Sequence, residues 1–421
     1  MKSAAERRFA EDLDRCLAGG LPGRIGVAVS GGGDSTALLC LMADWSKSSG
    51  IAIEAVTIDH NLRDAARAEA RMAGETCAAL GVPHETRVWA GWDGAGNLQD
   101  AARRARQRLI AQWAETRGIE RVALGHTQDD QAETLVLRLA RGSGVDGLSA
   151  MASRRTAGGL TWLRPLLGWK RAALRQLLRE RNVPWADDPS NEDPQFARVR
   201  VRKILAEIAP LGLDVDALAA TADRLWVARE ALEIATQNAA RQMARVTKTG
   251  DVALDTKLFA DLPAESRSRL MAHALCWVAT APYPPRRGPL EVLIADVIAG
   301  RRGTLAGCLV ASRDRMTTHI CREPQAVAHT TAEPGAVWDG RWVLGHSGQN
   351  DGCDIRALGQ DGLKACPDWR GLDAPRASLI SLPAVWRGEK LVAAPLAGLG
   401  AGWSCRLIHG TDHFFASILS H

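Results

Sequence analysis

Short apolar runs alternate along the first third of the chain with longer stretches in which apolar residues recur every three or four positions. The short runs predict β-strands and the longer stretches predict amphipathic helices. The predicted strands are Arg24–Val29, Ile51–Ile58, His84–Trp89 and Arg121–Leu124. After a leading helix within residues 1–21, the predicted helices are Thr36–Trp45, Ala65–Leu80, Leu98–Arg117 and Asp129–Arg141. This alternation favours an α/β fold, with a parallel sheet, right-handed crossovers and helices on both faces.

The pattern changes after residue 160, where a basic helix (Lys170–Arg181) and a basic run (Arg198–Lys203) surround a turn-rich segment. Helical periodicity dominates residues 210–322, and the polar segment Glu323–Pro334 is typical of a linker. Short strands are predicted at Trp338–Leu344, Ser378–Leu382 and Lys390–Ala394. We therefore expect three domains: an α/β domain at 1–209, a helical middle domain at 210–322 and a small α+β domain at 335–421.

Composition restricts the environment. No apolar run is long enough to cross a membrane and the first residues lack a signal-peptide segment, so we expect a cytoplasmic protein. Nine cysteines without a Cys-x-x-Cys pair indicate reduced thiols rather than a disulfide or zinc framework. The formal net charge of +5 is modest, so a polyanionic partner must be bound by a local patch.

A glycine turn lies between the first predicted strand and the helix that follows it. It consists of Ser30, Gly31, Gly32, Gly33, Asp34 and Ser35. Glycines allow the backbone to approach a ligand closely, and the N-terminus of the next helix attracts an anion. The run lacks the lysine of a Walker A loop and the third glycine of a dinucleotide fingerprint. The alternative is a glycine hairpin capped by Asp or Ser.

Polar residues also follow the other predicted strands. Asp59 and His60 follow the second strand, and Gly125 and His126 follow the fourth. Ligands of parallel sheets bind beyond the carboxyl ends of the strands, so these residues should converge with the glycine turn on one edge. Just beyond His126, Asp130 and Glu133 are three residues apart in a predicted helix and share one face. Together they can meet one cation, either magnesium or an ammonium group, although acidic residues also simply complement a helix N-terminus.

These motifs together resemble one family. The glycine turn is similar to the signature of the PP-loop, or N-type, ATP pyrophosphatases. Taken in order, six segments resemble the tRNA(Ile)-lysidine synthetase family over the first half of the chain: residues 30–35, 59–63, 96–103, 125–134, 141–144 and 188–191. A weaker likeness at 382–395 concerns the terminal domain of longer members.

The resemblance implies a ligase that joins free L-lysine to C2 of the wobble cytidine in the CAU anticodon of tRNA(Ile). The family consumes ATP with Mg²⁺, forms an adenylated cytidine, and releases AMP and pyrophosphate. The expected catalytic residues are Asp34, Asp130 and Glu133, with Asp34 also expected to hold the metal. The expected nucleotide-binding residues are Ser30, Gly31, Gly32, Gly33, Asp34, Ser35, Asp59, His60, Arg103, Gly125 and His126. For Arg103 a plain surface position is the alternative, and for His126 a structural position at the strand end.

The basic segments are the expected RNA-binding part of the catalytic domain. The candidate phosphate contacts are Lys170, Arg171, Arg175, Arg198, Arg200, Arg202 and Lys203. Solvated helix faces are the alternative for such runs. By the same resemblance, the middle and terminal domains should contact the body of the tRNA. Val199 and Gln107 depart from the family pattern, which questions individual contacts but not the fold.

Other functions fit part of the sequence, among them small-molecule PP-loop amidating enzymes, which would not need the helical half of the chain. A PP-loop tRNA 2-thiocytidine synthetase shares the loop but resembles Cys-x-x-Cys iron–sulfur proteins, and this chain has no such pair. A non-catalytic ATP-responsive RNA-binding protein would not require Asp34, Asp130 and Glu133. A homodimer is left open by the sequence.

Overall fold

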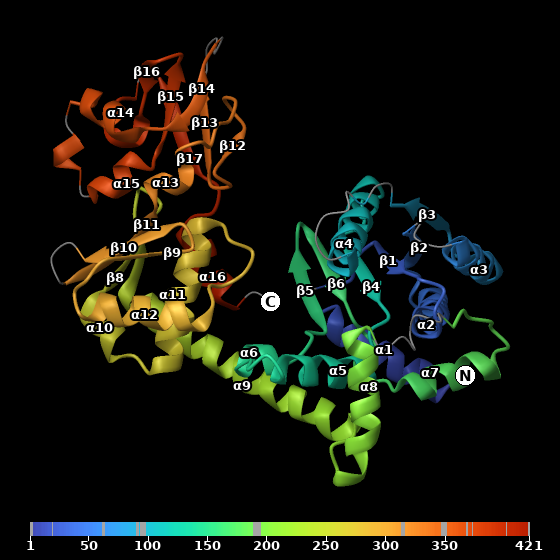
Figure 1. Ribbon diagram of the computed structural model, residues 1–421. Coiled ribbons are helices and arrows are strands. Elements are labelled where there is room, and N and C mark those ends of the chain that lie inside the picture. Colours follow the sequence, from blue (N-terminus) through green and yellow to red (C-terminus); the bar gives the residue numbers. More distant parts are fainter. Residues whose placement is uncertain are drawn as a thin grey trace. The chain divides into compact units, whose positions relative to one another are not determined.

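The computed structural model describes residues 3–18, 20–60, 64–89, 92, 98–187, 195–312, 316–346, 352–367, 369–372, 374–400 and 402–419. The chain divides into two compact units, one reaching Arg229 and the other beginning at Glu230. Figure 1 shows the elements of both units. Parts of three family-like motifs, at residues 61–63, 96–97 and 188–191, lie outside the described residues.

A six-stranded sheet organises the first unit. Its order is β3 (His84–Val88), β2 (Ala52–Asp59), β1 (Arg24–Ala28), β4 (Arg121–Leu124), β6 (Leu160–Leu163) and β5 (Arg154–Ala157). Adjacent strands are parallel except at the edge, where β5 pairs antiparallel with β6. The chain leaves β1 toward β2 and β3, and later returns to the other side of β1 with β4. The reversal of strand order beside β1 creates the crevice in which such sheets bind ligands.

The alternation of side chains along β1 separates two apolar layers. Ile25 and Val27 face a core shared with α1 (Ala4–Cys16), α2 (Gly33–Ser49), α3 (Asp64–Leu80) and α7 (Arg171–Glu180). On the other face of the sheet, Val56 and Val122 pack with Trp113 of α4 (Leu98–Thr116). Strand side chains point alternately to opposite faces, so a single short strand contributes to both layers. The predicted α/β class with helices on both faces is confirmed (Figure 1).

Three further helices complete the first unit: α5 (Gln128–Leu139), α6 (Val145–Leu148) and α8 (Ala197–Ile208). Of these, α5 and α8 form a small apolar cluster with Ala150 and the start of α9 (Val215–Met243). The hairpin of β5 and β6 is absent from the sequence prediction because its strands are four residues long and β5 is polar. Its signal is the pair Gly158 and Gly159, both at positive φ (62° and 76°), as two-residue hairpin turns require.

The second unit contains more β-structure than the periodicity predicts. Five antiparallel strands occur where only helices are expected: β7 (Ala244–Val246), β8 (Val252–Asp255), β11 (Thr317–Arg322), β10 (Cys308–Ser312) and β9 (Gly303–Leu305). They pack with α10 (Thr256–Asp261), α11 (Ala264–Ala279) and α12 (Arg287–Ile298). The strands are only three to six residues long, too short for periodicity to distinguish them from loops.

Two three-stranded sheets follow. One consists of β12 (Val337–Trp338), β13 (Trp342–His346) and β17 (Trp403–Leu407), and the other of β14 (Asp354–Ala357), β15 (Pro383–Arg387) and β16 (Lys390–Ala393). The remaining helices are α13 (Pro324–Val327), α14 (Gly359–Ala365), α15 (Arg376–Ile380) and α16 (Thr411–Ala416), with 3₁₀ turns at Ala209–Leu211, Trp369–Gly371, Pro395–Ala397 and Ser417–Leu419.

The strand predicted at Ser378–Leu382 is wrong, because α15 covers most of it. All five residues of Ser378–Leu382 are buried. A short buried helix and a buried strand give the same run of buried positions in the sequence. The three-domain division with boundaries at 209, 322 and 335 stays a prediction. Among the described residues, no helix combines the length and apolar character needed to cross a membrane.

The packing at Gly26 gives a test of the sheet. A Cβ atom at this position would lie 2.8 Å from Trp113 Cζ3 and 2.9 Å from Val122 Cγ2. Gly26→Ala should therefore lower the free energy of unfolding by about 1–3 kcal/mol through overpacking, measured by urea denaturation. Gly23→Ala is the matched control, because nothing lies within 4 Å of its Cβ position. Equal stability of the two variants would contradict this packing.

Candidate active site

The glycine turn connects β1 to α2 in a conformation that its residues require. Gly31 has a φ of 83°, and a Cβ atom there would lie 3.0 Å from the carbonyl oxygen of Glu69. Ser35 holds the turn internally: its hydroxyl accepts from the N–H of Ser30 at 3.1 Å and donates to Gly32 O at 2.9 Å. Gly32, which precedes α2, has no side chain to cap the helix. The first N–H groups of α2 are therefore available to an anion.

The end of β4 lies directly against the first turn of α2. A Cβ atom on Gly125 would be 3.0 Å from both the N and Cα atoms of Ser35. Only glycine permits this approach without a shift of backbone. Because β1 and β4 are parallel neighbours, the residues that follow Gly125 lie beside the glycine turn.

Three carboxylates meet one guanidinium beside the glycine turn. Arg171, the first residue of α7, donates from Nε to Asp34 Oδ2 at 3.0 Å and from Nη2 to Asp130 Oδ1 at 3.2 Å. Its Nη1 lies 3.5 Å from Glu133 Oε1. The backbone N–H of Arg171 donates to Asp129 at 2.8 Å, which fixes the start of α7. Each of these carboxylates follows β1 or β4.

The start of α5 orients Asp130 toward this guanidinium. Asp130 Oδ2 accepts from the backbone N–H of Thr127 at 2.9 Å and from its hydroxyl at 3.1 Å, as part of a capping box. The other oxygen, Oδ1, is thereby directed to Arg171. Burial by itself would raise the pKa of Asp130, but the charge of Arg171 and the N–H of Thr127 outweigh it and lower the pKa below 3.8. Asp130 is therefore ionised at neutral pH.

Two arginines of α8 complete the charge balance. Arg202 donates to Glu133 Oε1 at 2.6 Å, and Arg198 Nη1 lies 3.7 Å from Asp130 Oδ1. The two are four residues apart and so lie on one face of the helix. Burial by itself would lower the pKa of Arg171. The negative charges of Asp130 and Asp34 outweigh burial, so the pKa of Arg171 is raised. The cluster thus holds three carboxylates and three guanidinium groups.

Several buried polar atoms at this edge make no hydrogen bond with any described residue. They are Asp34 Oδ1, Glu133 Oε2, His60 Nδ1, His126 Nδ1 and Trp185 Nε1. Trp185 lies against the glycine turn, since a Cβ atom on Gly33 would be 3.3 Å from its Cδ1. Buried polar groups without partners are rare in folded proteins and costly. Their concentration around the glycine turn marks a ligand site.

His126 is neutral at this edge. Burial, followed by the charge of Arg164, lowers its pKa to about 3. Burial and the charge of Arg106 also lower the pKa of His60, which contacts Trp89 edge to face at 5.8 Å. Both imidazoles can therefore donate and accept hydrogen bonds at pH 7 without carrying a charge.

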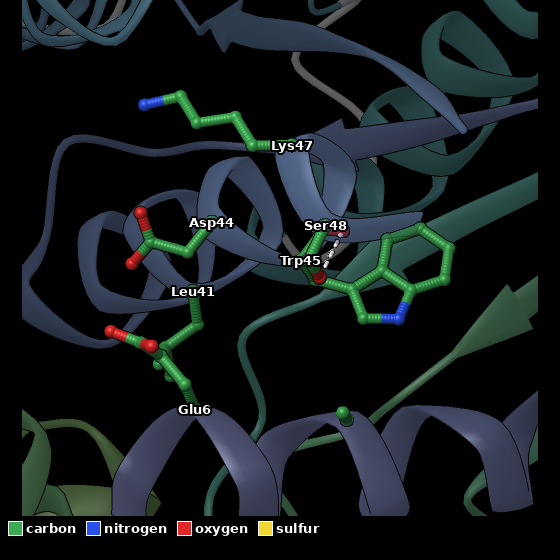
Figure 2. Close-up of a pocket in the computed structure, with 7 residues that line it drawn as sticks. Glu6, Leu41, Asp44, Trp45, Lys47 and Ser48 are labelled. Carbon is green, nitrogen blue, oxygen red and sulfur yellow. Dashed lines mark hydrogen bonds between the residues drawn. The ribbon is translucent and has the colours of Figure 1, made fainter. Parts of the chain in front are cut away.

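The first unit also has a cavity away from the glycine turn and its carboxylates. It measures about 260 Å³, lies between α1 and α2, and is lined by Glu6, Ala10, Leu41, Asp44, Trp45, Lys47 and Ser48. Figure 2 shows Glu6 and Asp44 on the same side of it, and Arg181 bridges their carboxylates at 3.4 and 2.5 Å. Asp44 is eleven residues beyond Gly33 along α2, about 16 Å from the glycine turn. This cavity is therefore not part of the carboxylate site.

Comparison with known proteins identifies the family. The PP-loop domain model matches residues 3–208. A tRNA(Ile)-lysidine synthase of Ruegeria pomeroyi is 48% identical over 400 residues, which cover 95% of this chain and 95% of that protein. The chain belongs to the tRNA(Ile)-lysidine synthase family. The lysidine synthase of a Bradyrhizobium species is 40% identical over 314 residues (72% and 84% of the two chains), and that of Wolbachia pipientis is 30% identical over 386 residues (88% of each).

Membership of the lysidine synthase family confirms the resemblance seen in the motifs, and the structure locates each predicted residue. Ser30 to Ser35 form the turn, Asp59 ends β2 and is buried, and Gly125 and His126 follow β4. Asp34, Asp130 and Glu133 lie together on Arg171. Arg103 is exposed in the second turn of α4. The roles assigned to these residues stay predictions.

The seven candidate RNA contacts separate into two groups. Arg171, Arg198 and Arg202 pair with the carboxylates, although 40% of the Arg198 side chain is exposed. The other four lie away from these carboxylates: Lys170 pairs with Asp216 at 2.5 Å, Arg175 pairs with Asp187 at 2.8 Å, Arg200 donates to the carbonyl of Gln195 at 2.9 Å, and Lys203 is exposed.

Sequence reasoning missed several residues of this edge. No sequence pattern around Trp185 predicts that it lies at the site. The chain is held against the glycine turn by the backbone N–H of the next residue, Ala186, which donates to Gly31 O at 2.9 Å. Arg106 lies one helical turn beyond Arg103 on α4, so its charge could have been assigned to the site along with that of Arg103. Arg164 follows β6 as His126 follows β4, and recognition of the Gly158-Gly159 hairpin would have revealed it.

Arg171 is the group whose removal should unbalance the cluster. Arg171→Gln should lower the free energy of unfolding of the first unit by about 2–4 kcal/mol at pH 7, because it leaves buried carboxylates without their common counter-charge. The low folded-state pKa of Asp130 gives stability that is fully present above its unfolded value of about 3.9 and is lost as the pH falls through the folded value. The deficit of the variant should therefore be largest near pH 8 and shrink as the pH falls, because carboxylates that are buried without the guanidinium take up protons above their ordinary pKa.

Urea denaturation across this pH range measures the effect. The control is Arg175→Gln on the same helix, whose partly exposed pair with Asp187 should contribute less than about 1 kcal/mol. A deficit for Arg171→Gln that is no larger than that of the control would show that the carboxylates do not depend on this guanidinium.

Proposed function

We propose that this protein ligates free L-lysine to C2 of the wobble cytidine in the CAU anticodon of tRNA(Ile). The observation that carries the proposal is the convergence of Asp34, Asp130 and Glu133 beside the glycine turn, with Asp34 Oδ1 and Glu133 Oε2 unpartnered among the described residues. Membership of the lysidine synthase family over 95% of the chain supports it.

The chemistry requires two displacements. The C2 carbonyl oxygen of cytosine first attacks the α-phosphorus of ATP, which forms an O–P bond and releases pyrophosphate. The ε-amine of lysine then attacks C2, loses a proton, and expels AMP together with the former carbonyl oxygen. A carbonyl oxygen is a poor leaving group by itself, so ATP is consumed to convert it into a phosphate ester.

The residues of the glycine turn fit ATP and Mg²⁺. Free N–H groups at the start of α2 suit a phosphate, and the unpartnered Oδ1 of Asp34 suits a hard cation. No three His, Cys, Asp or Glu side chains of the described residues are arranged around a single metal position. Mg²⁺ commonly binds through one carboxylate together with substrate phosphates, so Asp34 would hold it. When bound, the ion neutralises charge that develops on the phosphates.

Asp130 and Glu133 suit the amine of lysine. The free amino acid is an ammonium ion at neutral pH, with a pKa of about 10.4, so its site must attract a cation and then accept a proton. Asp130 is held ionised by Arg171, and Glu133 keeps Oε2 without a partner among the described residues. Arg171 and Arg202 hold the other oxygens of the pair in place. Glu133 therefore presents a fixed acceptor to the amine.

His126 and Trp185 suit the nucleosides. A neutral imidazole can donate to a base or ribose and accept from it, without placing a second positive charge next to Arg164. Trp185 offers an unpartnered indole N–H beside the glycine turn. Lys170, Arg175, Arg200 and Lys203 are on the surface where RNA phosphates can reach them. We also propose that the second unit contacts the body of the tRNA.

Asp34 provides the first test of the reaction. Wild-type protein, ATP, Mg²⁺, labelled lysine and a tRNA(Ile) transcript with a CAU anticodon should yield label in the RNA. Asp34→Asn should reduce AMP formation by at least about 10²-fold, because a charge that stabilises the transition state is lost, while the fold is kept. Asp44→Asn, at the other end of α2, is the control and should retain activity. Wild-type turnover of Asp34→Asn would remove this residue from the mechanism.

Glu133 provides a separate test of the lysine site. Glu133→Gln should raise the KM for lysine by about 10²-fold, since a charge-assisted contact to the ammonium is lost. Pyrophosphate release that depends on tRNA but not on lysine should continue at close to the wild-type rate. Loss of that lysine-independent release, with an unchanged KM for lysine, would instead assign Glu133 to the nucleotide.

A further inference from the structure

A second group of arginines lies beyond His126 at the same edge of the sheet. We name it the arginine surface. It consists of Arg103, Arg138, Arg141, Arg155, Arg164 and Arg229, from α4, α5, the turn after α5, β5, the end of β6 and α9. Arg138 and Arg164 donate to backbone carbonyls. The turn Gly142–Gly144, which ends α5, lies among them.

Arg164 is the most informative member. It follows β6, and its backbone N–H donates to Ser153 O at 2.7 Å, which continues the pairing of β6 with the chain before β5. Trp162 packs on the α4 side of the sheet, so Arg164, two residues later, points to the same side. Only 8% of Arg164 is exposed, Nη1 donates to Ala152 O at 2.8 Å, and Nε makes no hydrogen bond with any described residue. A buried guanidinium with a free N–H is costly unless an anion binds.

The groups around Arg164 do not neutralise its positive charge. Burial, and then the charges of Arg155, Arg103 and Arg138, lower the pKa of Arg164 to about 10. Cys16 would favour its charge, but burial raises the pKa of that thiol to about 11, so it is neutral at pH 7.

Arg138 has a similar electrostatic environment to that of Arg164. Burial lowers its pKa first, followed by the charges of Arg229, Arg103, Arg141 and Arg155. Its Nη1 donates to the carbonyls of Gly147 and Ala150, each at 2.7 Å. These acceptors fix the side chain but carry no negative charge. Asp146 gives the surface one carboxylate, 3.7 Å from Arg229. Positive charge is therefore in excess here, and a polyanion would relieve it.

The order of the strands indicates which anion binds. Along the edge of the sheet the glycine turn follows β1, His126 follows β4 and Arg164 follows β6, so Arg164 is two strand spacings, about 10 Å, from the phosphate site at β1. The surface extends farther still, to Arg155 on the edge strand β5. It is thus too far from the glycine turn, and has too many charges, to serve the triphosphate of ATP alone.

We propose that the arginine surface binds consecutive phosphodiester groups of single-stranded RNA next to the reacting cytidine. This inference rests on the proposed function, because it assumes an RNA substrate whose base enters between β1 and β4. Arg164 holds the phosphate closest to His126, and Arg141 and Arg155 contact the phosphates farther out. A guanidinium can bind one phosphate through two N–H groups, which fixes the backbone while the base reaches the site.

The test uses exposed members of the surface, so that folding is not at risk. Arg141 and Arg155 are both exposed. Arg141→Gln/Arg155→Gln should weaken binding of the tRNA(Ile) transcript by about tenfold or more at moderate salt, measured by filter binding. Between about 50 and 200 mM salt, the slope of log affinity against log salt should become shallower by about 0.7 for each lost phosphate contact. The affinity for ATP should be unchanged.

A matched control removes the same charge at the opposite edge of the sheet. Lys47 is in the last turn of α2, and Arg117 follows α4 just before β4 begins. Lys47→Gln/Arg117→Gln should bind RNA as the wild type does. An equal loss of RNA affinity in the control would show that the effect depends only on the net charge of the protein, and would overturn the proposal.

Two other outcomes also overturn the proposal. Unchanged RNA affinity in the Arg141/Arg155 variant would exclude the surface as an RNA site, and an equal loss of ATP affinity would assign it to the nucleotide. Arg164→Lys, which keeps the charge but not the two-pronged donor, should lower RNA affinity while the affinity for ATP is unchanged. Absence of lysine incorporation by the wild type would refute the proposed function instead, and the RNA affinities can be compared independently of it.

Discussion

Three carboxylates share the guanidinium of Arg171, and the arrangement of the first unit depends on this shared charge. Asp34, Asp130 and Glu133 would repel one another if they were buried without it, and burial would then favour their protonated forms. Arg171 lowers the pKa of Asp130, whereas at Asp34 burial outweighs the guanidinium and the pKa is raised. The contacts of Arg171 with the three carboxylates hold α7 against the ends of β1 and β4. Arg198 and Arg202 extend the same balance to α8. A site with balanced charge can accept the ammonium group of lysine and the phosphates of ATP without rebuilding its scaffold.

Close backbone packing brings these charges together. Gly125 allows the end of β4 to lie against the first turn of α2, and Gly31 allows the turn to pass so close to α3 that a Cβ atom would be 3.0 Å from the carbonyl oxygen of Glu69. A side chain at either position would separate the glycine turn from the acidic start of α5. The same packing leaves several polar atoms buried without partners among the described residues. The scaffold therefore keeps polar groups ready to bind a ligand at the place where we propose that the substrates react.

The arginines of the first unit serve two different electrostatic purposes. Those on α7 and α8 neutralise carboxylates inside the site, whereas those of the arginine surface have mostly one another as charged neighbours. In strand order, Asp34 follows β1 and Arg164 follows β6, on opposite sides of β4 and His126. This separation would place a cationic substrate and ATP near β1 and a polyanionic one near β6. An RNA ligase that uses an amino acid requires both environments within a few strand spacings.

The sequence by itself determined the features that depend on short-range constraints. Apolar periodicity predicts the order of strands and helices up to Leu139. The glycine turn is predicted by residues that tolerate positive φ. Helical spacing predicts that Asp130 and Glu133 share one face. The convergence of Asp34 with Asp130 could also be predicted, because parallel strands end at a common edge.

Only the tertiary structure decided which basic residues enter the site. Arg171 and Arg175 are one turn apart in the same helix, yet the first is among the buried carboxylates and the second is at the surface. Arg164 gained its position from the hairpin of β5 and β6, and Trp185 from a single backbone contact to Gly31. These placements depend on which strands pair and which face each side chain takes, and such contacts join residues that are far apart along the chain and leave no local pattern.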